Sequence, residues 1–217
     1  MREKFQRFYH CLAQPLQFRS RILLAVLAIP LALVFSAPLW TLSMQAPQYP
    51  EGLHLHIYAH TVTGDVAEVN TLNHYIGMQA INRATLSDLD WIPFAVGVLI
   101  LLLLRVAAIG DLRSLCDVLV LFLYFSAFSM ARFAYRLYVF GHNLDPSAPF
   151  EVEPFTPAIF GTQQVANFTI TSLPAGGSMW IGLFAIGLLS AVVWNFTANW
   201  RENPAAGRGA AAPVGSR

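Results

Sequence analysis

The sequence predicts an all-α membrane protein with four transmembrane helices and a histidine-rich extracytoplasmic loop between the first two. Two observations support this fold class. First, the chain of 217 residues is 56% hydrophobic and only 12% charged, whereas soluble domains carry about 25% charged residues. Second, the runs 22–34, 94–104 and 180–193 are apolar on every side. Such a helix requires lipid, or a larger core than this chain is able to build.

Residues 1–21 form a basic arm in which arginine and lysine outnumber the one acid, Glu3. Phe5, Phe8 and Leu12 are interleaved with the basic residues, a pattern typical of an amphipathic segment that lies on the membrane surface. A solvated arm explains the same composition, and both interpretations stay open.

The first apolar span covers 22–40. A cleaved signal peptide is the alternative, because the small pair Ser36–Ala37 follows an apolar run. We reject it because the run continues to Trp40, which is long enough to cross a bilayer, and because Pro38 would follow the cut directly. Pro30 removes an amide donor and predicts a kink in this span.

The remaining elements follow from the same alternation of apolar runs and polar segments. Asp88 and Asp90 precede the second span as candidate N-caps, and Pro93 fits its first turn. The prolines of the second large loop predict an extended path with few hairpins. The predicted segments are the loop 41–90, the span 91–109, the cytoplasmic turn 110–114, the span 115–140, the Pro-rich loop 141–176, the span 177–197 and a disordered tail over 198–217.

Basic residues near the span ends predict the orientation. Arg105, Arg113 and Arg201 fall on the same side as the basic arm, and the two large loops contain only Arg83. We therefore expect both termini in the cytoplasm and both large loops outside. Cys11 and Cys116 then lie on the reducing side, where thiols persist.

Four of the six histidines lie in the first large loop. Leu53 to His60 alternates as a strand does, which places His54, His56 and His60 on one polar face and could form a small β-hairpin within the loop. Three imidazoles on one face are a plausible metal platform.

A second pair of candidate ligands follows in the same loop. If 73–78 is a helical turn, His74 and Met78 share a face. Imidazole with thioether suits copper, and imidazole alone also accepts zinc. We predict copper as the cofactor, with Met44 as a weaker candidate. The predicted metal ligands are His54, His56, His60, His74 and Met78.

A purely structural interpretation explains the same residues. His54 and His56 would then form the polar face of a half-buried hairpin that turns at 63–65. His74 would bond a nearby carbonyl, and Met78 would pack in a core.

Two arginines lie inside the third span. Arg132 and Arg136 are four residues apart and share a helix face, so we consider them as a docking site for a partner subunit or an anionic group. The alternative is that both side chains extend towards the membrane surface. Asp117, in the same span, is too far along the helix to pair with them.

The motifs of several functional classes are missing. The chain has no Ser-His-Asp spacing, no glycine-rich phosphate loop and no haem attachment motif, and the predicted spans contain no histidine for a buried haem. A proton or ion path would require more intramembrane acids than Asp117. We therefore expect a protein that is not an enzyme and has no nucleic-acid partner.

Two strings of the first loop resemble a known family. W-x-L-x-M-x-A-P-Q-Y-P-x-G-L at 40–53 and N-x-L-N-H-Y-I-G-M at 70–78 are similar to sequences of small bacterial inner-membrane proteins associated with gene clusters for nitrous oxide reductase and other copper respiratory enzymes. The resemblance covers about residues 38–95. It implies an inner-membrane accessory protein for a copper enzyme outside the membrane.

The functional expectation combines the loop and the resemblance. It is a membrane accessory protein whose outer loop binds or delivers copper during assembly of a respiratory enzyme, with membrane lipid and that enzyme as partners. The alternative is a non-catalytic structural or scaffold subunit of a respiratory or other membrane complex, which uses Arg132 and Arg136 for docking. An enzyme or transporter in its own right is the third possibility.

Overall fold

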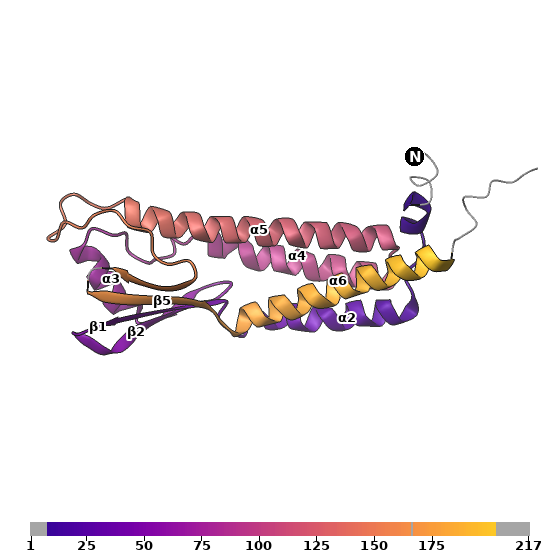
Figure 1. Ribbon diagram of the computed structural model, residues 1–217, viewed down its shortest axis with the longest axis horizontal. Coiled ribbons are helices and arrows are strands. Elements are labelled where there is room, and N and C mark those ends of the chain that lie inside the picture. The colour runs from indigo at the N-terminus through magenta and orange to yellow at the C-terminus, as the bar shows by residue number, and fades with distance from the viewer. Residues whose placement is uncertain (1–7, 166, 203–217) are drawn as a thin grey trace, which may run out of the picture.

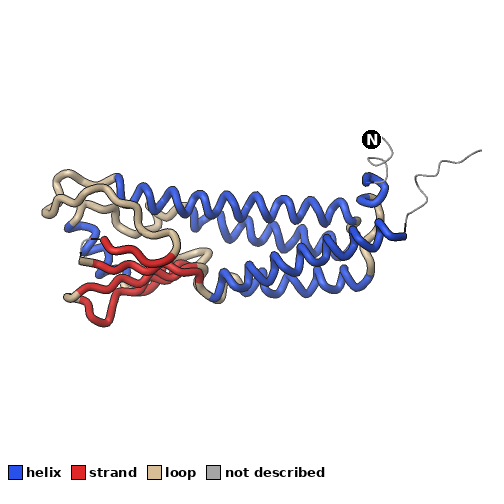
Figure 2. Tube along the Cα trace, viewed as in Figure 1, coloured by secondary structure: helices blue, strands red, loops and turns tan. Residues whose placement is uncertain are grey.

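The computed structural model describes residues 8–165 and 167–202, so parts of the predicted arm and tail, 1–7 and 203–217, lie outside the described residues. Long helices form one end of the molecule, and a β-sheet forms the other (Figures 1 and 2). The helices are α2 (Phe18–Leu33), α3 (Val66–Tyr75), α4 (Asp88–Ile109), α5 (Leu112–His142) and α6 (Gly176–Glu202). The strands are β1 (Trp40–Ala46), β2 (Tyr49–Ile57), β3 (Val62–Gly64), β4 (Gly161–Val165) and β5 (Phe168–Pro174).

The all-α prediction is wrong, because residues 40–64 and 161–174 fold together into one five-stranded antiparallel sheet. The strand order is β3-β2-β1-β5-β4. Strand β1 lies at the centre, where Trp40 pairs with Ile57 of β2 on one side and with Pro174 of β5 on the other. The segment 141–176, predicted to have few hairpins, forms the β4–β5 hairpin, because its prolines lie outside 161–173.

The prediction of four spanning helices is also wrong. Three helices are long and apolar enough to cross a membrane: Asp88–Ile109, Leu112–His142 and Gly176–Arg201. The predicted spans 91–109, 115–140 and 177–197 lie within them. The predicted first span, 22–40, is instead a helix of 16 residues that ends at Leu33. Residues 34–39 form a turn, and polar and apolar residues alternate from Trp40 onward, where β1 begins.

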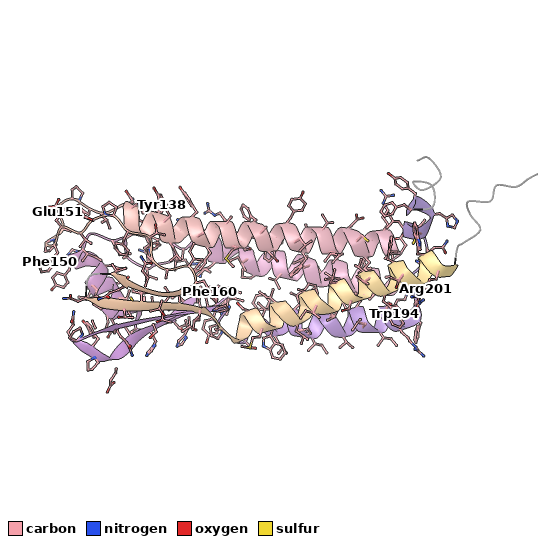
Figure 3. All side chains as sticks on the ribbon, in the orientation of Figure 1. Tyr138, Phe150, Glu151, Phe160, Trp194 and Arg201 are labelled. Carbon is pink, nitrogen blue, oxygen red and sulfur yellow. The ribbon has the colours of Figure 1, made fainter. Side chains whose placement is uncertain are left out.

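The helices pack around leucine and phenylalanine side chains. Leu24 of α2, Leu103 of α4, Leu115 of α5 and Phe184 of α6 are fully buried. Helix α2 lies alongside α4 and α6 (Figure 1). Many of the outward side chains are large and apolar (Figure 3), as expected for helices that face lipid.

One face of the sheet is apolar and packs against the short helix α3. Leu42 of β1 and Leu53 and Leu55 of β2 form this core with Val69 of α3. The opposite face carries serine, threonine, glutamine and histidine side chains, since successive residues of a strand point to opposite sides. The sheet and α3 therefore enclose an apolar core of their own at the end of the helices.

Candidate functional site

His54 and His56 lie on the polar face of β2. Their strand neighbours Leu53, Leu55 and Ile57 pack into the sheet core, so the alternation expected from the sequence exists up to the end of the strand. His54 is opposite Ser43 of β1, and His56 is opposite Thr41. The His54 ring is exposed, whereas the Nδ1 atom of His56 is buried and has no hydrogen-bond partner among the described residues.

The other three predicted ligands lie elsewhere. His60 follows the end of β2, and its ring is 6.4 Å from that of Phe35 and 5.9 Å from that of Tyr58. His74 is exposed on α3, whereas Met78 lines an apolar cavity. In 8–165 and 167–202, no three histidine, cysteine or acidic side chains are arranged to hold a metal ion. No three of the predicted histidine ligands are therefore gathered at one point in this part of the chain.

The 70–78 string forms a structural turn. The N–H of Met78 donates to the carbonyl of Asn73 (2.8 Å), and the Asn73 side chain donates to the carbonyl of Gln79 (3.2 Å). Gly77 has a φ of +76°, a conformation that favours glycine. The turn joins the segment 41–90 to the segment 141–176, because the N–H of Phe150 donates to the carbonyl of Tyr75 (3.0 Å).

A cavity of about 440 Å³ lies between the sheet and the helices. Its size is within the range of about 300–1,000 Å³ that ligand pockets occupy. Leu42, Leu55 and Ile170 of the sheet line one end, and Leu99 and Phe122 of the helices line the other. Nearly all of the walls are apolar side chains.

The cavity exists because two helices diverge. Helices α5 and α6 contact each other where the rings of Phe122 and Phe184 lie 5.0 Å apart. From there α5 and α6 separate towards the sheet (Figure 1), and the sheet covers the space between them. Helix α3 and the loop before α4 contribute Leu72, Ile76 and Leu86 to the walls.

A cluster of three charges lies on the cavity wall. Arg132 donates from Nε and Nη2 to the two carboxylate oxygens of Asp88, both at 3.0 Å. Arg136 donates from Nε to Asp88 (2.7 Å) and from Nη2 to the Ser87 hydroxyl (2.9 Å). The cluster joins the first turn of α4 to α5.

The cluster is mostly shielded from solvent. The exposed fractions of the side chains are 17% for Asp88, 33% for Arg132 and 25% for Arg136. The Arg132 guanidinium also lies 5.7 Å from the centre of the Tyr135 ring. Both guanidinium groups point to Asp88, which holds them between α4 and α5.

A serine completes the polar groups of this wall. Ser129 lies three residues before Arg132, so the two share a face of α5. Its hydroxyl is buried and has no hydrogen-bond partner among the described residues. An apolar cavity with a charged cluster and a free hydroxyl on one wall is chemically suited to an amphiphile, a molecule with an apolar chain and a polar head.

Sequence reasoning identified two of these residues and missed the third. Arg132 and Arg136 were recognised as intramembrane charges, but Asp88 was assigned to a helix cap. Helix α4 instead begins after Ser87, and the Asp88 carboxylate bonds to α5. The signal available was the presence of an acid at the end of one span and two arginines near the same end of the next.

No protein-family model, no curated protein and no solved structure matches this chain, so neither the fold nor the site is assigned through a relative.

Proposed function

We propose that the protein is a non-catalytic membrane protein that holds the acyl chain of a membrane lipid in the cavity between its sheet and its helices. The observation that carries this proposal is the cavity itself, about 440 Å³ with almost wholly apolar walls. An acyl chain that fills the cavity gains van der Waals contacts with its walls, and such contacts drive association between apolar groups inside a membrane. The acyl chains of lipids are the most abundant apolar groups around membrane helices.

We place the sheet on the outer side of a bacterial inner membrane and the turn between α4 and α5 on its cytoplasmic side. Arg201 lies at the end of the helices opposite Phe150 and Glu151 (Figure 3). Arg105 and Arg113 flank the turn between α4 and α5, which is at the same end as Arg201. An excess of arginine on one side marks the cytoplasmic side.

The test is lipid retention in a purified sample. The protein is extracted in mild detergent, exchanged extensively, and examined by native mass spectrometry for bound lipid. Ser126→Phe and Ser129→Phe each place a ring in the cavity and are expected to reduce retention strongly. Ala127→Phe adds the same ring to an exposed position of α5 and is expected to retain lipid as the unaltered protein does. Equal retention in all four proteins would contradict the proposal.

A second candidate function is copper binding at the polar sheet face, and the pair His54 and His56 favours it. These histidines are separated by one residue on one strand face, and imidazole is a copper ligand. Copper would be held there for transfer to a partner enzyme of the outer side. Titration with Cu(II) is expected to give one site that is lost in His54→Ala and His56→Ala. His142→Ala serves as the control, and unchanged stoichiometry in the two variants excludes the site.

A further inference from the structure

The charge on the cavity wall is unbalanced. Asp88, Arg132 and Arg136 are the charged groups among the described residues that line the cavity. Two guanidinium groups face one carboxylate, which leaves a net charge of about +1, since arginine stays protonated in proteins. A partly buried charge is costly unless it is paired, so the cluster is suited to one further anion.

Both arginines retain free donors. A guanidinium has five N–H groups, and the interactions of each arginine with Asp88 and Ser87 use two of its nitrogen atoms, Nε and Nη2. The Nη1 groups make no hydrogen bond to any residue of 8–165 or 167–202. Guanidinium groups bind carboxylate and phosphate oxygens with matching geometry.

The spacing of two residues that line the cavity matches one half of a bilayer. Phe122 lies ten residues before Arg132 on α5, about 15 Å along the helix at 1.5 Å per residue. The hydrocarbon core of a bilayer is about 30 Å thick, so about 15 Å separates its centre from either surface. An acyl chain that reaches Phe122 from Arg132 therefore spans one leaflet.

From these observations we propose that the lipid held in the cavity is anionic, with its phosphate or carboxylate bound by Arg132 and Arg136. This inference rests on the proposed function, because it assigns the headgroup of the same lipid. The acyl chain runs from Arg132 towards Phe122. Ser129, about 4.5 Å below Arg132 along the helix, donates its hydroxyl to an oxygen of the headgroup or of the ester.

The test compares two lipids that differ in their headgroups. The protein is reconstituted with equal amounts of phosphatidylglycerol, which is anionic, and phosphatidylcholine, which has no net charge, both carrying the same chains. Retained lipid is then measured by native mass spectrometry. We expect retention of the anionic lipid to exceed that of the neutral lipid about tenfold, as for hydrogen bonds to a charged group.

Two substitutions separate charge recognition from a structural role. Arg136→Gln leaves the pair of Asp88 and Arg132 in place and lowers the net charge to zero, so the preference for the anionic lipid is expected to fall to about one. Asp88→Asn raises the charge to +2, so the preference is expected to rise. A merely structural cluster would lower lipid retention in both variants without changing the ratio of the two lipids.

The outcomes of the two proposals are distinguishable. Retention of neither lipid by the unaltered protein overturns the proposed function, and with it this inference. Equal retention of both lipids overturns only the anionic headgroup. Should Arg136→Gln fail to fold, Ser129→Ala offers a milder test, because loss of its hydroxyl is expected to weaken retention of the anionic lipid severalfold. Unchanged retention in Ser129→Ala would remove that residue from the headgroup site.

Discussion

Gly77 accepts a hydrogen bond from the N–H of Asp145 at 2.8 Å, and this contact fastens the turn after α3 to the loop that follows α5. The backbone passes so closely there that a Cβ on Gly77 would lie 2.7 Å from the carbonyl oxygen of Asp145. The glycine of the N-H-Y-I-G-M string is therefore required by the approach of two backbones.

Substitution of this glycine is expected to destabilise the sheet domain. Gly77→Ala combines a left-handed φ with a backbone clash, and we expect a loss of about 1–3 kcal/mol in the free energy of unfolding. Thermal unfolding in detergent, followed by tryptophan fluorescence, measures the loss. Gly182→Ala is the control, because a Cβ there meets no atom within 4 Å and alanine favours a helix. Equal stability of both variants would refute the role of Gly77.

The two acids of the first turn of α4 are expected to differ in their contributions to stability. Asp88→Asn leaves two partly buried guanidinium groups without a carboxylate, so the free energy of unfolding is expected to fall by about 1–3 kcal/mol. Asp90 pairs with Arg83 at 2.6 Å, but these side chains are 50% and 85% exposed. Asp90→Asn is therefore expected to change stability by less than about 0.5 kcal/mol. Chemical denaturation of both variants checks the difference.

Asp111 is expected to give stability a dependence on pH. Its carboxylate accepts a hydrogen bond from the N–H of Ser114 at 2.9 Å. Hydrogen bonds from the Ser114 side chain and backbone hold the pKa of Asp111 below its ordinary value. The carboxylate therefore stabilises the folded state above the ordinary aspartate pKa of about 3.9, and this contribution is lost as the pH falls through the lower pKa of the folded state.

The contribution of Asp111 to stability is expected to be that of a helix N-cap. Asp111→Ala is expected to lower the free energy of unfolding by about 1 kcal/mol at neutral pH, and the difference from the unaltered protein should shrink in acid. Asp111→Asn also caps a helix, so it should keep most of the stability without the pH dependence. Unfolding measured at neutral and acidic pH compares the three proteins. A difference that persists unchanged in acid would contradict the assignment.

The length of the acyl chain offers a separate prediction. Each methylene removed from a chain that lies in the cavity is expected to weaken binding, because the cavity walls lose the van der Waals contacts that the group made. Lipids with one headgroup and a series of chain lengths, compared by native mass spectrometry, provide the measurement. Retention that does not change with chain length would mean that the chain lies outside the cavity.

The sequence predicted the helices well where a long apolar run stood alone. Helices α4, α5 and α6 contain the predicted spans, because lipid-facing helices require such runs. The strand from Leu53 was visible in its alternation. The prediction of the first span was wrong beyond Leu33, because residues 34–40 continue the apolar composition although the helix ends and a turn leads into β1.

The sheet and the cavity depend on contacts between distant parts of the chain, which local sequence patterns do not predict. Met44 pairs with Ile170, and the sequence of neither strand predicts the other as its partner. The divergence of α5 from α6, and the pairing of Asp88 with Arg132, likewise arise only from packing in three dimensions. The histidines of the first loop were conspicuous in the sequence. In the described structure, His54 and His56 share a strand face, and the other predicted ligands lie elsewhere.

Strand β1 carries a consequence for biosynthesis. It pairs with β2 within a few residues of chain, but its other partner, β5, begins roughly 120 residues later, after α4 and α5. At translation rates of about 5–20 residues per second, this interval lasts on the order of ten seconds. Throughout it, the nascent chain presents β1 with one open strand edge, and the arrival of β5 closes that edge.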